Sequence, residues 1–220
     1  MPKTLRWAGA VGSTTLLLAG SVWVFWHEDW RFSLPTPVPA GYPRIAPGTA
    51  VPAEALRVVG VRGPMDRPLF LHFYGKECPC SSFNVDHVRG LVRRFDSRAR
   101  FVAVLVGETA GSGGVEAARG LLGMEAFADT RGDLAAAVGV YSTPQAAIVD
   151  SHGRLFFRGN YNTNRYCSTP LTEFARLALE ALLRGDEPPT FSSVATVAYG
   201  CALPDATEPT ANAVRSEPSR

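Results

Sequence analysis

The strongest constraint in this 220-residue chain is a run of 20 residues without a formal charge, residues 7–26. About 20 helical residues, each rising 1.5 Å, reach across a hydrocarbon core of roughly 30 Å. Basic residues precede the run and acidic residues follow it. The run therefore predicts a transmembrane helix, with a cytoplasmic stub at residues 1–6 and the rest of the chain exported.

A cleaved signal peptide is the main alternative for this run. Its length exceeds a typical signal-peptide core, and no clear small-x-small cleavage site follows it before the charged residues. The stretch Leu-Ala-Gly-Ser at residues 18–21 resembles a lipoprotein signal, but Ser21 stands where the lipidated cysteine is required. A buried helix of a soluble protein is a third, less favoured interpretation. We expect an uncleaved anchor.

The length and composition of the whole chain predict one globular domain as the default. Hydrophobic residues make up 46% and charged residues 19%, which excludes a fully disordered chain, and the net charge of +2 argues against a nucleic-acid partner. Residues 27–55 are rich in proline and predict an extended linker that lifts the domain off the membrane. We expect the domain at residues 56–185 and a Pro/Ser/Thr-rich tail at residues 186–220.

The hydrophobic pattern predicts an α/β fold with a mixed central sheet flanked by helices. Apolar runs predict strands, and amphipathic segments closed by glycine predict helices. The expected strands are residues 68–74, 101–106, 145–150 and 154–158, and the expected helices are residues 81–95, 114–122, 131–138 and 171–183.

Two cysteines, Cys78 and Cys80, stand at the start of the first domain helix, directly after a strand and a short loop. The unpaired N–H groups and the positive end of a helix dipole favour a thiolate there. A thiolate is required both for disulfide exchange and for binding a soft metal ion. Two inert thiols near a helix end are the alternative.

These residues resemble the thioredoxin-like superfamily, in particular its membrane-anchored bacterial thiol-disulfide proteins. One half of the resemblance is the strand–Cys–helix opening with its Cys-Pro-Cys-Ser motif. The other is Thr143-Pro144, followed by an apolar strand, an Asp-x-x-Gly-Arg turn and a second strand. The resemblance covers about residues 50–185 and implies a three-layer thioredoxin-like fold. It also implies location in the bacterial inner membrane, single-pass, with the domain on the periplasmic side.

The resemblance implies roles for individual residues. Cys78 falls on the attacking cysteine of the family and Pro144 on its cis-proline, whose neighbouring backbone at Thr143 binds substrate chains. Ser81 falls on the resolving cysteine, so the usual Cys-x-x-Cys pair is broken, and Cys80 is an additional thiol. Either Cys80 resolves a mixed disulfide at Cys78, in a tight Cys-x-Cys ring, or a substrate thiol does so.

His72 lies in the strand before the cysteines, where many thioredoxins hold a buried carboxylate. A histidine there would carry protons near neutral pH, or it is a core histidine bonded to a backbone group. His87 is expected to be a solvated surface residue, and His152 a turn residue.

Two further cysteines lie later in the chain. We expect a structural disulfide between Cys167 and Cys201 that staples the tail to the domain, because the tail carries an apolar stretch at residues 194–199. The alternative is that Cys167 acts as a relay thiol for Cys78 or Cys80.

The leading functional expectation is an anchored thiol-disulfide oxidoreductase that acts on exported protein thiols and exchanges electrons with a partner protein. No nicotinamide or flavin fingerprint is present, so no cofactor is expected. The alternative is a copper(I) chaperone that uses Cys78 and Cys80 with a histidine. A peroxiredoxin is less favoured, because Gly75 stands where those enzymes place Thr or Ser, and a redox-inactive scaffold is the last alternative.

Overall fold

The computed structural model describes residues 3–30, 34–107, 111–163 and 167–204. The chain divides into two units, Met1–Pro35 and Thr36–Arg220. The first unit holds α1 (Lys3–Phe25), continued by the π-helical turn η1 (Trp26–Trp30). By length and composition one helix, over Trp7–Glu28, is suited to crossing a membrane, a test that a signal sequence also passes.

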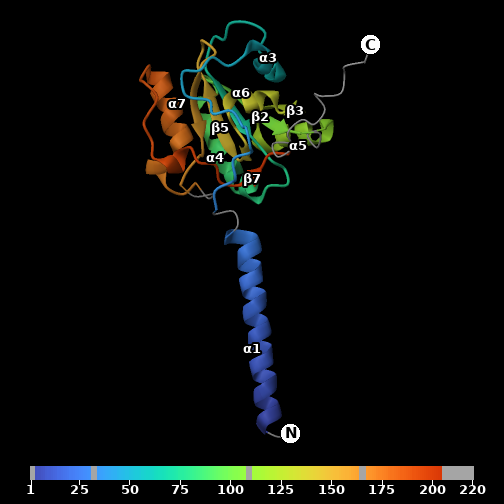
Figure 1. Ribbon diagram of the computed structural model, residues 1–220. Coiled ribbons are helices and arrows are strands. Elements are labelled where there is room, and N and C mark those ends of the chain that lie inside the picture. The colour runs from blue at the N-terminus through green and yellow to red at the C-terminus, as the bar shows by residue number, and fades with distance from the viewer. Residues whose placement is uncertain (1–2, 31–33, 108–110, 164–166, 205–220) are drawn as a thin grey trace, which may run out of the picture. The chain divides into compact units, whose positions relative to one another are not determined.

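The second unit is built on a five-stranded mixed sheet with the strand order β3-β2-β1-β5-β6 (Figure 1). β1 pairs parallel to β2, and β2 parallel to β3, whereas β5 runs antiparallel to both β1 and β6. The strands of this sheet are β1 (Leu69–Phe73), β2 (Arg100–Val106), β3 (Glu125–Asp129), β5 (Gln145–Val149) and β6 (Leu155–Gly159). A separate antiparallel pair joins β4 (Ser142–Thr143) and β7 (Cys201–Ala202).

Helices cover both faces of the main sheet. The helical elements are α3 (Ala53–Leu56), η2 (Arg57–Val59), α4 (Pro79–Phe95), α5 (Ser112–Leu122), α6 (Asp133–Val138), η4 (Pro170–Thr172), α7 (Phe174–Arg184) and η5 (Ser193–Ala195). Apolar side chains of α4, α5 and α7 pack in one core cluster with Phe70. Those of α3 and α6 pack in a second cluster with Leu69 and Leu71. Successive residues of β1 thus face opposite layers, as a strand requires.

The predicted fold class, an α/β fold with a mixed central sheet flanked by helices, is confirmed. Each strand and helix expected between residues 68 and 183 is present, with ends shifted by at most three residues. β3 was not predicted. Its sequence Glu-Ala-Phe-Ala-Asp lacks β-branched residues, and it becomes a strand by pairing with β2 at the edge of the sheet.

The structure corrects the expected spacer at residues 27–55. The Thr36 N–H donates a hydrogen bond to the carbonyl of Ala198 at 2.8 Å, and the Val51 N–H donates to that of Gly153 at 2.8 Å. Val51 is also buried in the core. The proline-rich residues from 36 onward therefore pack against the domain, because backbone groups of this segment form hydrogen bonds with other parts of the domain.

Candidate active site

Cys78 occupies the N-cap position of α4. Its carbonyl accepts a hydrogen bond from the Ser81 N–H at 3.0 Å, and Pro79 fills the first helical position. The Cys78 side chain is only 4% exposed. The positive end of the α4 helix dipole lies at this position and favours a negative charge on sulfur. This is the strand–Cys–helix opening expected from the sequence.

The Thr143–Pro144 peptide bond is cis, as predicted. It faces the cysteine loop, since the Cys78 Sγ lies 3.3 Å from the Thr143 carbonyl oxygen. A Cβ atom added to Gly75 would stand 2.6 Å from the Thr143 Oγ1 and 3.1 Å from the Cys78 Cβ. The two loops therefore approach so closely that only glycine fits at position 75.

Cys78 forms a disulfide with Cys201, across a sequence separation of 123 residues and a Cα–Cα distance of 5.8 Å. The expected Cys167–Cys201 disulfide is therefore wrong in its partner, although Cys201 does tie the tail to the domain. The physical reason is the path of the tail. β7 pairs with β4, which sets Cys201 opposite Thr143, and the carbonyl of Thr143 is the group that Cys78 contacts.

Cys167 lies away from that disulfide. Its thiol donates a hydrogen bond to the Asn84 Oδ1 at 3.0 Å, on α4. Burial, followed by the negative charge of Glu173, raises the pKa of Cys167 to about 12. A thiol with this pKa is protonated at neutral pH, which argues against the alternative role as a relay thiol.

Cys80 and Ser81 both lie in the buried first turn of α4. Cys80 is outside the disulfide, so the expected Cys-x-Cys ring with Cys78 is not the pairing found here. The Ser81 hydroxyl accepts a hydrogen bond from the Gly75 N–H at 3.2 Å. Ser81, three residues after Cys78, therefore has a side chain that holds the cysteine loop in place.

His72 is fully buried in β1, and its Nδ1 lies 2.7 Å from the Tyr161 hydroxyl, within hydrogen-bonding distance. Burial, with a smaller effect from His87, lowers the pKa of His72 to about 3. A proton carrier at neutral pH needs a pKa close to 7, so this pKa argues against that role. His72 fits the other expectation, a core histidine, with a tyrosine hydroxyl as its partner in place of a backbone group.

Two further histidines, His87 and His152, also have structural positions. His87 is half-buried and packs edge-on against Tyr161, with ring centroids 5.8 Å apart, so the expected solvated surface role is wrong. His152 lies in the turn before β6, as predicted, and its N–H donates to the Asp150 Oδ1 at 2.9 Å. In the described ranges, no group of three or more His, Cys, Asp or Glu side chains could hold a metal ion.

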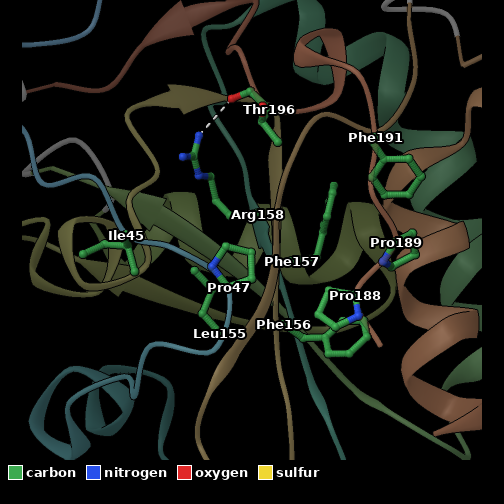
Figure 2. Close-up of a pocket in the computed structure, with 10 residues that line it drawn as sticks. All are labelled: Ile45, Pro47, Leu155, Phe156, Phe157, Arg158, Pro188, Pro189, Phe191 and Thr196. Carbon is green, nitrogen blue, oxygen red and sulfur yellow. Dashed lines mark hydrogen bonds between the residues drawn. The ribbon is translucent and has the colours of Figure 1, made fainter. Parts of the chain in front are cut away.

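The C-terminal segment, which we define as residues 191–204, is the part of the site that sequence reasoning missed. The Asn160 side-chain amide donates to the carbonyls of Val194 and Val197, at 2.7 and 2.6 Å. The Arg158 Nη1 donates to the Thr196 carbonyl at 2.9 Å, the dashed line in Figure 2. The apolar stretch 194–199 was the available signal, but it did not show where the segment would dock.

The pocket in Figure 2 lies between β6, the proline-rich residues near position 45 and the start of the C-terminal segment. Its volume is about 100 Å³. Its lining residues are Ile45, Pro47, Leu155, Phe156, Phe157, Arg158, Pro188, Pro189, Phe191 and Thr196. The lining contains no cysteine or histidine.

Comparisons with known proteins agree with this fold. A family model described as "Domain of unknown function (DUF6436)" matches residues 54–203. A hypothetical protein from Sinorhizobium meliloti 1021 is 18% identical, with a TM-score of 0.57 over 73% of this chain and 95% of that one. An uncharacterized conserved protein from Geobacillus kaustophilus is 23% identical, with a TM-score of 0.55 over 76% and 91%. Both are similar in fold alone.

A third solved structure is that of MTB dsbF in its mixed oxidized and reduced forms. It is 22% identical over 54% of this chain and 82% of that one, and its TM-score of 0.42 is too low to support a conclusion about this chain. The comparison with curated proteins found no match.

Proposed function

The chain belongs to the family described as a domain of unknown function, DUF6436, and we propose that it is a thiol-disulfide oxidoreductase that uses Cys78. One observation carries this proposal. The sulfur of Cys78 is engaged in a disulfide at the start of α4, in contact with the backbone that precedes a cis-proline. Disulfide exchange needs a thiolate that leaves and attacks easily, and the first turn of a helix favours one.

Each neighbour of Cys78 contributes to exchange in a defined way. The positive end of the α4 helix dipole stabilises the thiolate when it leaves a disulfide. The backbone of Ser142 and Thr143 pairs with an extended chain, here β7, and brings the sulfur of that chain to Cys78. Ser81 and Gly75 hold the loop so that the sulfur keeps its place. The partners would be exported protein thiols or disulfides and a redox partner protein.

The N-terminal helix supports a proposal about location, because it is long and apolar enough to cross a membrane. We propose that α1 is an uncleaved anchor in the bacterial inner membrane with the domain on the periplasmic side, an oxidising compartment. Its apolar side chains support this, since Leu16 and Leu17 are 76% and 72% exposed. We expect the full chain to stay in the membrane pellet after alkaline washing. Release into the wash would contradict an anchor.

Reduction of insulin by dithiothreitol tests the proposed activity. The full chain in detergent should speed the appearance of reduced insulin at least tenfold over the uncatalysed rate. Cys78→Ser should fall to that background, because no other described cysteine lies in this exchange position. Cys167→Ser is the control and should retain the wild-type rate. Equal rates for the wild type and Cys78→Ser would contradict the proposal.

A further inference from the structure

The C-terminal segment occupies the position that a substrate chain would need. Two pairs of residues, Ser142↔Ala202 and Thr143↔Cys201, form the antiparallel ladder of β4 and β7. The same ladder holds the sulfur of Cys201 on Cys78. Strand addition of this kind gives affinity through backbone bonds and selectivity through the side chains that must fit.

We propose that Cys201 is the resolving thiol of Cys78, and that the strip 199–203 is a built-in copy of the preferred substrate: an extended polypeptide with glycine directly before the reactive cysteine. This inference rests on the proposed function of Cys78. Cys201, which lies 123 positions after Cys78, takes the resolving role that Ser81 cannot perform.

Two parts of the C-terminal segment serve different purposes. The part 191–198 is fixed: Ala195 and Ala198 are fully buried, and the Asn160 N–H donates to the Ala195 carbonyl at 2.8 Å. This anchoring keeps Cys201 near Cys78 when the disulfide opens, which raises its effective concentration. The strip 199–203 is held by the two-residue ladder, and by the Leu203 N–H, which donates to the Tyr141 carbonyl at 3.0 Å.

Gly200 gives the strip its selectivity. Its φ is +135°, and a Cβ atom there would stand 2.2 Å from the Thr143 carbonyl oxygen and 3.1 Å from the Thr143 carbonyl carbon. A larger residue at this point would have to push the chain off the backbone of β4. A substrate that takes the same path meets the same restriction immediately before its cysteine.

The exchange balances without a cofactor. The Cys78 thiolate attacks a substrate disulfide, forms the Cys78–substrate bond and releases the first substrate thiolate. The Cys201 thiolate then attacks the Cys78 sulfur, forms the Cys78–Cys201 bond and releases the second substrate thiolate. Two electrons pass from the dithiol of the chain to the substrate disulfide. A dithiol protein restores the reduced chain by these two steps in reverse and is itself oxidised to a disulfide, and a substrate dithiol would be oxidised in the same way.

A peptide with the sequence of residues 197–204, Val-Ala-Tyr-Gly-Cys-Ala-Leu-Pro, tests the proposal as a probe. The full-length Cys201→Ser chain is mixed with the peptide activated as a mixed disulfide. A matched peptide carries valine in place of glycine, and glutathione disulfide is the small control. We expect the glycine peptide to label Cys78 at least tenfold faster than the valine peptide.

The resolving step is then measured with Cys201 present. The reduced wild-type chain should expel the bound peptide and form the Cys78–Cys201 disulfide at least 100-fold faster than Cys201→Ser loses the peptide. Cys167→Ser should behave as wild type. The two halves of the experiment use the same mass-spectrometric readout of Cys78.

Three results would overturn the inference. Equal labelling by the two peptides would remove the selectivity, and equal peptide release from wild type and Cys201→Ser would remove the resolving role. In both cases reaction of Cys78 with glutathione disulfide would leave the proposed function standing. If Cys78 of a chain that melts as wild type reacts with none of the three probes, the proposed function and the inference fail together.

Discussion

Gly75 is the single residue on which the contact between the two active-site loops depends most directly. Its missing side chain leaves room for Thr143, and its N–H is bonded by Ser81. Such a position is decided by contacts that form only in the folded chain. The sequence therefore shows that Gly75 lies just before the Cys-Pro-Cys-Ser motif, but it does not show which residues Gly75 contacts.

Gly75→Ala should place a methyl group 2.6 Å from the Thr143 Oγ1, so a loop must shift. Overpacking of this kind costs about 1–3 kcal/mol of unfolding free energy. We expect that loss in denaturant titrations, together with at least tenfold slower insulin reduction. Gly63→Ala is the control, because nothing lies within 4 Å of its added Cβ. An unchanged rate in Gly75→Ala would show that the loop contact is dispensable.

His72 makes the stability of the fold depend on pH. Its pKa of about 3 in the native state lies below the value of about 6.5 expected of the unfolded chain. At a pH between these two pKa values, His72 is protonated in the unfolded chain but neutral in the native chain. The free energy of unfolding therefore falls as the pH falls. The slope is about 1.4 kcal/mol per pH unit.

His72→Gln should remove this slope while keeping a polar group for Tyr161. The expected result is a smaller loss of unfolding free energy between pH 6 and pH 4 than in the wild type, whatever the absolute stability of the variant. Urea titrations across that range measure it. Parallel pH profiles for the two proteins would mean that His72 already takes up its proton in the folded state.

Among the secondary-structure elements, the C-terminal segment is what distinguishes this site from a Cys-x-x-Cys site. A Cys-x-x-Cys enzyme keeps both thiols on one helix, whereas here the partner sulfur arrives on β7, which pairs with β4. The part of the segment before β7 docks by way of Asn160 and Arg158. Local patterns predicted the helix and the strand, because each follows from neighbouring residues, and the resemblance to the thioredoxin-like superfamily implied the cis-proline. Neither could predict the path of the segment, because its partners, the side chains of Asn160 and Arg158 and the backbone of β4, are distant in the sequence.

Asn160→Ala should loosen this element. It removes two hydrogen bonds to the carbonyls of Val194 and Val197, worth together about 1–3 kcal/mol. Cys201 then loses effective concentration, so the Cys78–Cys201 disulfide should be reduced at a lower dithiothreitol concentration, by about fivefold or more.

Asn162→Ala is the matched control, because Asn162 is equally buried but donates to the Thr169 carbonyl, outside the C-terminal segment. It should lose stability without a change in the redox equilibrium. Equal redox shifts in the two variants would indicate a general loosening of the fold.

For the whole molecule, the disulfide links the middle of the domain to its last described strand. A closed loop of this size contributes about 2–5 kcal/mol by restricting the unfolded chain. We expect reductant to lower the unfolding free energy of the wild type by that amount without unfolding it, because the core clusters on both faces of the sheet contain neither sulfur of the disulfide. Cys201→Ser should show the reduced stability with and without reductant. Unfolding on reduction would instead mark the disulfide as a structural requirement.

The reactivity of Cys78 is the property on which the proposed thiol-disulfide exchange depends most. Alkylation of the reduced full-length chain by iodoacetamide from pH 5 to pH 10, read peptide by peptide, tests it directly, and Cys167 serves as the internal reference. We expect the Cys78 rate to reach half its plateau at least one pH unit below the ordinary cysteine value of about 8.5, while Cys167 stays unreactive below pH 10. A Cys78 midpoint at or above 8.5 would contradict the account.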